Sequence, residues 1–248
     1  MSGATLRVAA FLGCLWLTFA AASAAEIHIP LYHASYEVSR NGFQIGNAEF
    51  SLTRNGDGSY NYKSVTQPTG LAALFFNDVI TESSRFTVRD GEPESLQYDY
   101  KHSSNDDDKT EHILFDWENH RAESSTGKRQ KRLSIKPGTF DRALAQLAVS
   151  LDMATGKLAD SYCVLDHGEL SNYRMERDAD GKLRTPSGNY QVIEVARKDI
   201  KKKRTTTFWL APKVNYLPVK IEQTEPGKAT ISLTLTDIHL DQNKTDKP

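Results

Sequence analysis

The feature that most constrains the fold is a pair of alternating runs between Thr205 and Glu222. In the first run Thr206, Phe208 and Leu210 share one face, and in the second run Leu217, Val219 and Ile221 share one face. Because successive strand side chains point to opposite faces, this period predicts an antiparallel hairpin with one buried face. Pro218 has no backbone donor, so we expect its strand at a sheet edge or with a bulge there.

The same two-residue period recurs along most of the chain. Asn41-Gly42 separates two such runs, and this dipeptide is the strongest short signal for a hairpin with a type I′ turn. Asp178-Ala179-Asp180-Gly181 is interpreted as a further turn. The apolar phase shifts at Ile238, which predicts a bulge in the last strand, and Gly46 is a second bulge candidate. The pattern predicts a mainly β fold with a large antiparallel sheet.

One sustained helix is expected after these first strands. Its apolar stripe consists of Phe140, Leu144, Leu147, Ala148 and Leu151. Thr139 or Asp141 can cap the start, and Gly156 can end the helix. A single amphipathic helix among strands has to bury its stripe, so we expect it against the sheet face or at a barrel mouth, as core rather than as a partner-binding helix.

A second apolar segment, Leu71 to Phe76, follows Gln67-Pro68-Thr69-Gly70. Leu71, Leu74 and Phe75 have helical spacing, which predicts one or two helical turns. Two interpretations stay open for this segment. It is either a plug that covers one end of the sheet or a lid that faces a ligand.

The N-terminus has the pattern of an export signal. Arg7 precedes an apolar stretch, and Ala22-Ser23-Ala24 has the form of a processing site. We therefore expect residues 1–25 to be a signal peptide cleaved near Ala24 or Ala25, and the mature protein to be periplasmic. An uncleaved membrane anchor is the alternative, although the apolar run is short for a span. Residues 26–241 are expected to form a single β-barrel-like domain, with residues 242–248 as a disordered tail.

Composition excludes some classes of function. The chain has 31 Lys and Arg against 32 Asp and Glu, so it is a poor candidate for nucleic-acid binding. Cys163 is the only thiol beyond the expected leader, so no internal disulfide can form after cleavage. Its neighbours alternate as in a strand, and we expect it to be a small buried apolar residue.

No catalytic or metal-binding motif is recognisable, so we expect a non-enzyme without cofactor or metal. The nearest approach to a cluster is Asp166-His167-Gly168-Glu169, interpreted as a solvated hairpin tip because adjacent strand residues diverge to opposite faces. Two basic runs, Lys128–Arg132 and Lys201–Arg204, are interpreted as solubilising charge at strand edges. Attraction to anionic lipid head groups is the functional alternative for these runs.

Four segments together resemble a bacterial envelope family catalogued as domain of unknown function 3108. The similar segments are Gly70–Phe75, Gly91-Glu92-Pro93 before Tyr98-Asp99-Tyr100, Lys136–Asp141, and Phe208-Trp209-Leu210 followed by Leu217–Ile221. Their order and spacing cover most of the chain beyond the leader. The resemblance implies a periplasmic β-barrel or half-barrel with one helix, akin to lipoprotein-carrier folds. It implies no particular activity.

Two functional hypotheses follow. The first is a non-catalytic periplasmic protein that encloses an apolar or amphipathic ligand, such as a lipid or lipoprotein moiety, inside a curved sheet. Its candidate ligand-binding residues are Leu71, Phe75, Phe76, Leu144 and Trp209. The alternative is an envelope interaction or assembly module with a solid core, whose sheet edge near Pro218 or basic turns would contact an envelope protein or a polysaccharide. Peripheral contact with the membrane is kept as a separate alternative.

Overall fold

The computed structural model describes residues 29–75, 77–104, 108–199 and 203–241. The expected signal peptide and the expected tail lie outside these residues, as does Phe76.

The described residues form fifteen strands, one α-helix and two short 3₁₀ helices. Their bounds are β1 Tyr32–Arg40, β2 Phe43–Arg54, β3 Tyr60–Pro68, η1 Gly70–Leu74, β4 Val79–Arg89, β5 Glu92–Ser103, β6 Lys109–Asp116, β7 Arg121–Thr126, β8 Arg129–Ser134, β9 Thr139–Asp141, α1 Arg142–Thr155, β10 Ser161–Asp166, β11 Glu169–Thr185, β12 Gly188–Asp199, β13 Arg204–Ala211, η2 Pro212–Val214, β14 Leu217–Thr224 and β15 Ile231–Leu240.

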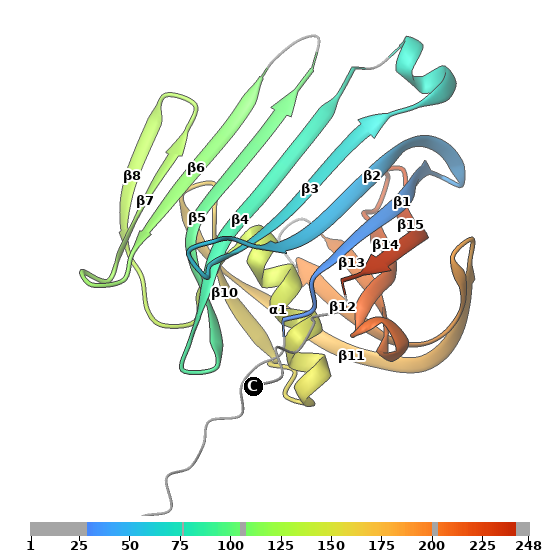
Figure 1. Ribbon diagram of the computed structural model, residues 1–248. Coiled ribbons are helices and arrows are strands. Elements are labelled where there is room, and N and C mark those ends of the chain that lie inside the picture. The colour runs from blue at the N-terminus through green and yellow to red at the C-terminus, as the bar shows by residue number, and fades with distance from the viewer. Residues whose placement is uncertain (1–28, 76, 105–107, 200–202, 242–248) are drawn as a thin grey trace, which may run out of the picture.

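All strands belong to one sheet with the order β8-β7-β6-β5-β4-β3-β2-β1-β15-β14-β13-β12-β11-β10-β9. Neighbours pair antiparallel, apart from the parallel pair of β9 and β10. Figure 1 shows the sheet curving around α1. The edge strands β8 and β9 do not pair with each other, so the sheet is an open half-barrel and not a closed barrel. The prediction of a mainly β, antiparallel fold with one main helix is confirmed.

The hairpin predicted between Thr205 and Glu222 is present as β13 and β14. Its register shifts between Trp209 and Leu210, which pair with Lys220 and Pro218, so Val219 is the extra residue of a bulge beside the proline. The expected bulge is therefore confirmed. The alternative of an edge strand is wrong, because β14 lies between β13 and β15.

The first hairpin and the last strand also follow the sequence pattern. Asn41 and Gly42 have φ values of 50° and 83°, the positive φ at both central residues that a type I′ turn requires. The pairing of β1 with β15 skips Thr236, two residues before Ile238, where the apolar phase shifts. A one-residue bulge there returns the following side chains to the buried face.

The turn predicted at Asp178–Gly181 is wrong. β11 runs through this stretch without reversing, and its register with β12 shifts between Arg177 and Asp180. The chain reverses later, where Thr185 pairs with Gly188. Small polar residues and glycine are common to bulges and turns, so the sequence pattern alone did not distinguish the two.

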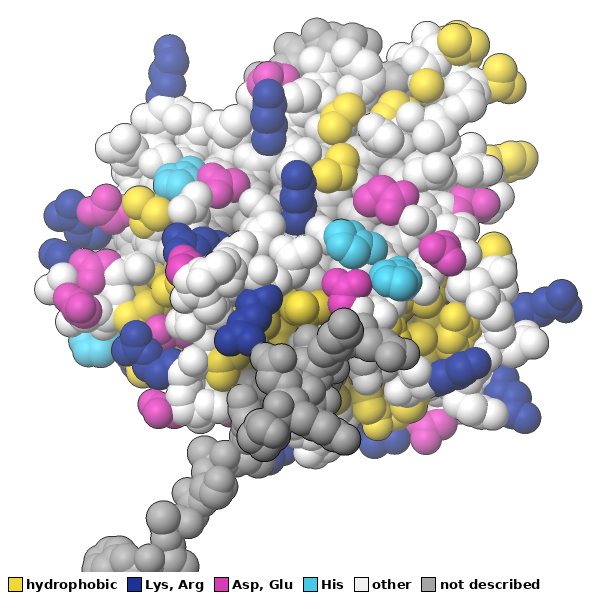
Figure 2. Space-filling model, viewed as in Figure 1, with side chains coloured by type: hydrophobic (Ala, Val, Ile, Leu, Met, Phe, Trp, Pro, Cys, Tyr) yellow, Lys and Arg dark blue, Asp and Glu magenta, His cyan; other side chains and the backbone are white. Residues whose placement is uncertain are grey.

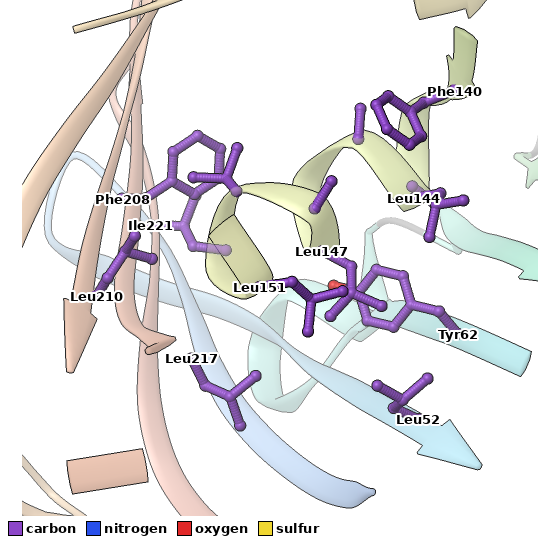
Figure 3. Packing of buried hydrophobic residues seen from close by; sticks show 14 of the residues in the cluster. Leu52, Tyr62, Phe140, Leu144, Leu147, Leu151, Phe208, Leu210, Leu217 and Ile221 are labelled. Carbon is purple, nitrogen blue, oxygen red and sulfur yellow. The ribbon is translucent and has the colours of Figure 1, made fainter. Parts of the chain in front are cut away.

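Helix α1 fills the concave side of the sheet. The side chain of Asp141 caps its start by accepting a hydrogen bond from Leu144 N at 2.8 Å, and Gly156 ends it with a left-handed φ of 70°. Nine residues of the helix are buried, from Ala143 to Met153. Figure 3 shows the helix between Leu52 and Tyr62 on one side and Phe208 and Ile221 on the other. The helix is thus part of the core, as predicted.

The apolar run after Pro68 does not plug the sheet. Gly70–Leu74 forms the 3₁₀ helix η1, none of whose residues is buried. Figure 1 shows η1 at the far end of the connection between β3 and β4, away from α1. The plug interpretation is wrong because the concave side is already filled by α1 and by strand side chains.

Candidate functional site

The structure separates the candidate ligand-binding residues that it describes. Leu71 and Phe75 lie together at the η1 end, with 79% and 73% of their surface exposed. Leu144 is fully buried in the core. Trp209 alternates with the buried Phe208 and Leu210, so its side chain is on the opposite face of β13, where Lys220 Nζ lies 4.5 Å from the ring centroid. Phe76 lies outside the described residues, and ligand binding by the set stays a prediction.

An exposed apolar tip is the most distinctive surface feature. We define the tip as residues 41–47 and 67–75, the turn of β1 with β2 and the segment around η1. The two parts are adjacent, since Thr69 N donates to Ile45 O at 3.2 Å and Gly46 pairs with Pro68. Four large side chains are more than 70% exposed, namely Phe43, Leu71, Leu74 and Phe75. Figure 2 shows hydrophobic side chains protruding at this end of the molecule.

The tip contains no charged residue in either of its two parts. A recess of about 440 Å³ lies next to it, lined in part by Ile45, Arg40 and Lys228. Lys228 is paired with Glu225 at 2.7 Å. A neutral apolar protrusion is thus bordered by a polar recess. Contiguous exposed apolar surface of this kind marks contact sites for proteins or membranes.

A charged cluster lies inside the half-barrel, at the start of α1. Arg142 Nε is 2.8 Å from Glu82 of β4, and Arg142 Nη1 is 3.5 Å from Asp166 of β10. The guanidinium also lies over the ring of Tyr100, 4.7 Å from its centroid. Tyr98 donates its hydroxyl to Glu82 at 2.6 Å. Arg142 therefore connects strands from the two arms of the sheet.

Burial and neighbouring charges both shift the pKa values of the side chains in this cluster. Burial by itself lowers the pKa of Arg142, but the carboxylates of Glu82 and Asp166 and the neighbouring Tyr98 raise it above its ordinary value. Arg142 therefore stays charged. Burial, reinforced by Glu82, raises the pKa of Tyr98 well above its usual range, so this hydroxyl acts as a neutral donor.

The polar lining continues across β11 to β14. Tyr173 donates to Asp166 Oδ2 at 3.3 Å, and the guanidinium of Arg197 lies 4.5 Å from the Tyr173 ring centroid. Burial raises the pKa of Tyr173 to about 12.

Arg197 donates to Thr206 at 3.2 Å, and Arg204 donates to Gln223 at 3.4 Å. Burial, together with Arg204 and Arg142, lowers the pKa of Arg197. Three arginines thus line one mouth of the half-barrel.

Side chains also link the two ends of the open sheet. We call this contact the seam and define it by Glu111 and Lys131 on one arm and Asp166–Glu169 on the other. Lys131 Nζ of β8 donates to Gly168 O at 3.1 Å and lies 3.7 Å from Glu169. Nδ1 of His167 lies 3.2 Å from Oε2 of Glu111 in β6. The sequence argument that Asp166 and His167 must diverge fails here, because His167 has a φ of 52° and belongs to the turn, not the strand.

A second recess, of about 400 Å³, lies beside the seam. Its lining includes Cys163, Thr139 and Leu170. Cys163 is half-buried, not buried as expected, and Thr139 Oγ1 lies 3.8 Å from its sulfur. Among the described residues, Glu111, Asp166 and His167 are the one set whose ligand atoms lie close enough together to hold a metal ion.

The pairing order and the single buried helix fit the resemblance noted in the sequence. A family model described as protein of unknown function (DUF3108) matches residues 35–235. The chain belongs to the DUF3108 family. The match begins within β1 and ends within β15, and so includes α1 and all the strands between these two. Among curated proteins, none matches this member of the family.

One solved structure shares the architecture at low identity. A β-barrel-like protein of the DUF1849 family from Brucella abortus is 9% identical, with a TM-score of 0.56 over 86% of this chain and 99% of that chain. This likeness shows the fold alone. The MucA/MucB complex of Pseudomonas aeruginosa is also 9% identical, with a TM-score of 0.37 over 86% of this chain and 52% of that chain. Within the described ranges, no helix has both the length and the apolar character needed to cross a bilayer.

Sequence reasoning missed the Arg142 cluster and the exposure of Phe43. Arg142 follows the helix cap and looks like an ordinary surface residue of a first turn, and its partner Glu82 is 60 positions away. One signal was available, because Phe43 directly follows the Asn-Gly turn. A residue at the end of a hairpin extends beyond the core that its strand packs against.

Proposed function

We propose that this protein is an exported, non-catalytic envelope protein that docks peripherally on a membrane surface through its apolar tip. The observation that carries the proposal is the tip itself, with four large apolar side chains exposed by more than 70% and no charge among its residues. Export rests on the sequence pattern of residues 1–25, with Arg7 ahead of an apolar stretch and a small-residue processing site.

The shape of the tip favours a membrane over a protein partner. Its side chains project from two short loops at one end of the molecule (Figures 1 and 2) and do not form a broad face. Each partner of a standard protein interface contributes about 20–30 residues. Insertion into the interfacial region of a bilayer requires no complementary shape. Full burial of four such side chains would contribute roughly 6–12 kcal/mol before entropic costs.

Vesicle flotation tests this proposal. The purified protein should float with vesicles of phosphatidylethanolamine and phosphatidylglycerol, and the variants Leu74→Asp and Phe75→Asp should lose most of this binding. Leu114→Asp is the matched control, because Leu114 is an exposed leucine on β6, outside the tip. Equal flotation of the tip variants and the control would refute membrane docking by the tip. A stoichiometric protein crosslinked at Phe43 in cells, without vesicle binding, would assign the tip to a protein partner.

Binding of an amphipathic ligand inside the sheet is the second candidate function. Three arginines at the mouth, Arg142, Arg197 and Arg204, favour it because they could hold an anionic head group. The apolar part of the ligand would have to displace side chains that now pack against α1. Native mass spectrometry of gently purified protein tests this candidate, and a consistently empty species would count against it.

A further inference from the structure

We propose that Glu111, Asp166 and His167 form a binding site for a divalent transition-metal ion, with Zn²⁺ as the probe, which bridges the seam of the half-barrel. One ligand atom from each residue lies within 4.8 Å of the others. Two ligands of a tetrahedral zinc ion, each about 2.1 Å from it, are about 3.4 Å apart. The present separations therefore need only a small closure, which the exposed side chain of His167 can provide.

Glu111 is the independent observation that points to a ligand. Its side chain is fully buried, and Oε2 accepts no hydrogen bond although His167 Nδ1 lies 3.2 Å away. The other oxygen accepts a long contact of 3.5 Å from the Ser124 hydroxyl. Burying a carboxylate oxygen that accepts no hydrogen bond destabilises the folded state. A bound cation is one of the few partners that would remove this free-energy cost. The oxygen is directed at the other two members of the set.

The carboxylates of Glu111 and Asp166 are not fully balanced by positively charged side chains. Glu111 and Asp166 each place a carboxylate oxygen within 4.8 Å of the other. The single charge of Arg142 is shared between two carboxylates, since its guanidinium is 2.8 Å from Glu82 and 3.5 Å from Asp166. Lys131 is directed to Gly168 O and Glu169 instead. A divalent ion at the set would neutralise both carboxylates.

The chemistry of the donors indicates which ions fit. One imidazole with two carboxylates suits first-row ions such as Zn²⁺, whereas all-oxygen sets suit Mg²⁺ and Ca²⁺. The His167 side chain is 54% exposed and Asp166 21%, so an ion can enter from solvent and keep a water ligand. Because Glu111 belongs to β6 and the other two to the end of β10 and its turn, a bound ion would tie together the two arms of the sheet.

Zinc titration by calorimetry, on metal-stripped protein in a Cys163→Ser background, tests the site. One Zn²⁺ should bind per chain and raise the melting temperature. His167→Asn should weaken binding by more than the roughly tenfold that loss of a supporting hydrogen bond costs a metal site. Asparagine tolerates the positive φ of this turn position, so the variant should fold. Glu111→Gln should weaken binding similarly.

His239→Asn is the control, because His239 is an exposed histidine 3.5 Å from Asp241 and lies on a different strand. The site is supported if zinc binding and the rise in melting temperature survive in this control and are lost in His167→Asn. It is overturned if the parent protein shows no saturable zinc binding. It is equally overturned if His167→Asn binds zinc as the parent protein does.

Discussion

The buried cap of α1 should make the stability of this fold depend on pH in an unusual direction. Asp141 is fully buried, and its carboxylate accepts hydrogen bonds from Leu144 N, Ser84 Oγ and Ser95 Oγ at 2.6–2.8 Å. Burial raises its pKa to about 6 from 3.8, although these hydrogen bonds act in the opposite direction. The folded state therefore holds a proton that the unfolded state has already released between these two pH values.

The sign and the size follow from proton linkage. A raised folded-state pKa gives stability that is complete below pH 3.8 and is lost as pH rises through about 6. A shift of about two units corresponds to roughly 3 kcal/mol, since one unit is worth about 1.36 kcal/mol. Asp141→Asn keeps a good helix cap but cannot ionise. The free energy of unfolding of the parent protein relative to this variant should thus fall by roughly 3 kcal/mol between about pH 4 and pH 7.

Urea unfolding followed by tryptophan fluorescence at several pH values measures this difference. Asp116→Asn is the control, because Asp116 is a surface carboxyl whose pKa is lowered by hydrogen bonds from Asn119. The stability of the parent protein relative to this variant should change little over the same range, because the stability that a lowered pKa contributes is complete above pH 3.8 and is lost only as pH falls below that value. A difference between the parent and Asp141→Asn that stays constant from pH 4 to pH 7 would refute the assignment of a buried, proton-binding cap.

Three further predictions concern stability and can be checked by the same urea unfolding. Leu147→Ala should cost about 2–5 kcal/mol, because Leu147 is buried between helix and sheet. Gly46→Ala should destabilise, because its Cβ would meet the backbone of β3, whereas Gly56→Ala has open space and should be nearly neutral. Arg142→Met should cost roughly 3 kcal/mol by leaving partly buried carboxylates unpaired, and adding Glu82→Gln should recover part of that loss.

Much of the fold could be predicted because its signals are local. Alternation defines a strand within a few residues, and Asn41-Gly42 defines a turn by the positive φ that both residues adopt. The same locality explains the error at Asp178–Gly181. A bulge and a turn use similar residues, and only the partner strand β12 distinguishes them by continuing the pairing on both sides of the shift. The path of a long strand therefore depends on information outside its own sequence.

The candidate sites could not be predicted, because strands far apart in the chain bring their residues together. Asp166 and His167 were visible as neighbours, but Glu111 comes from β6, and only the curvature of the sheet brings it to them. For the tip, the sequence shows only the apolar segment from Leu71 to Phe76, and the pairing of Gly46 with Pro68 brings Phe43 to the same end of the molecule. The segment around η1 lies away from α1, at the far end of the connection between β3 and β4, and ligand contact by Leu71 and Phe75 stays a prediction.

The open edges of the sheet connect these findings. A half-barrel leaves two unpaired strand edges, which favour aggregation unless they are charged or covered. Edge strand β8 carries the exposed Arg129, Lys131 and Arg132, so the basic run predicted to protect an edge does lie on one. The other edge, β9, is three residues long and leads directly into α1.

Lys131 also joins the two arms of the sheet by donating to Gly168 O. Its charge therefore protects the edge strand and also closes the seam. Lys131→Ala should therefore lower the stability of the fold and increase its concentration-dependent association. Arg132→Ala is the control, because it removes only a surface ion pair with Glu123 on the neighbouring strand. It should change neither property strongly.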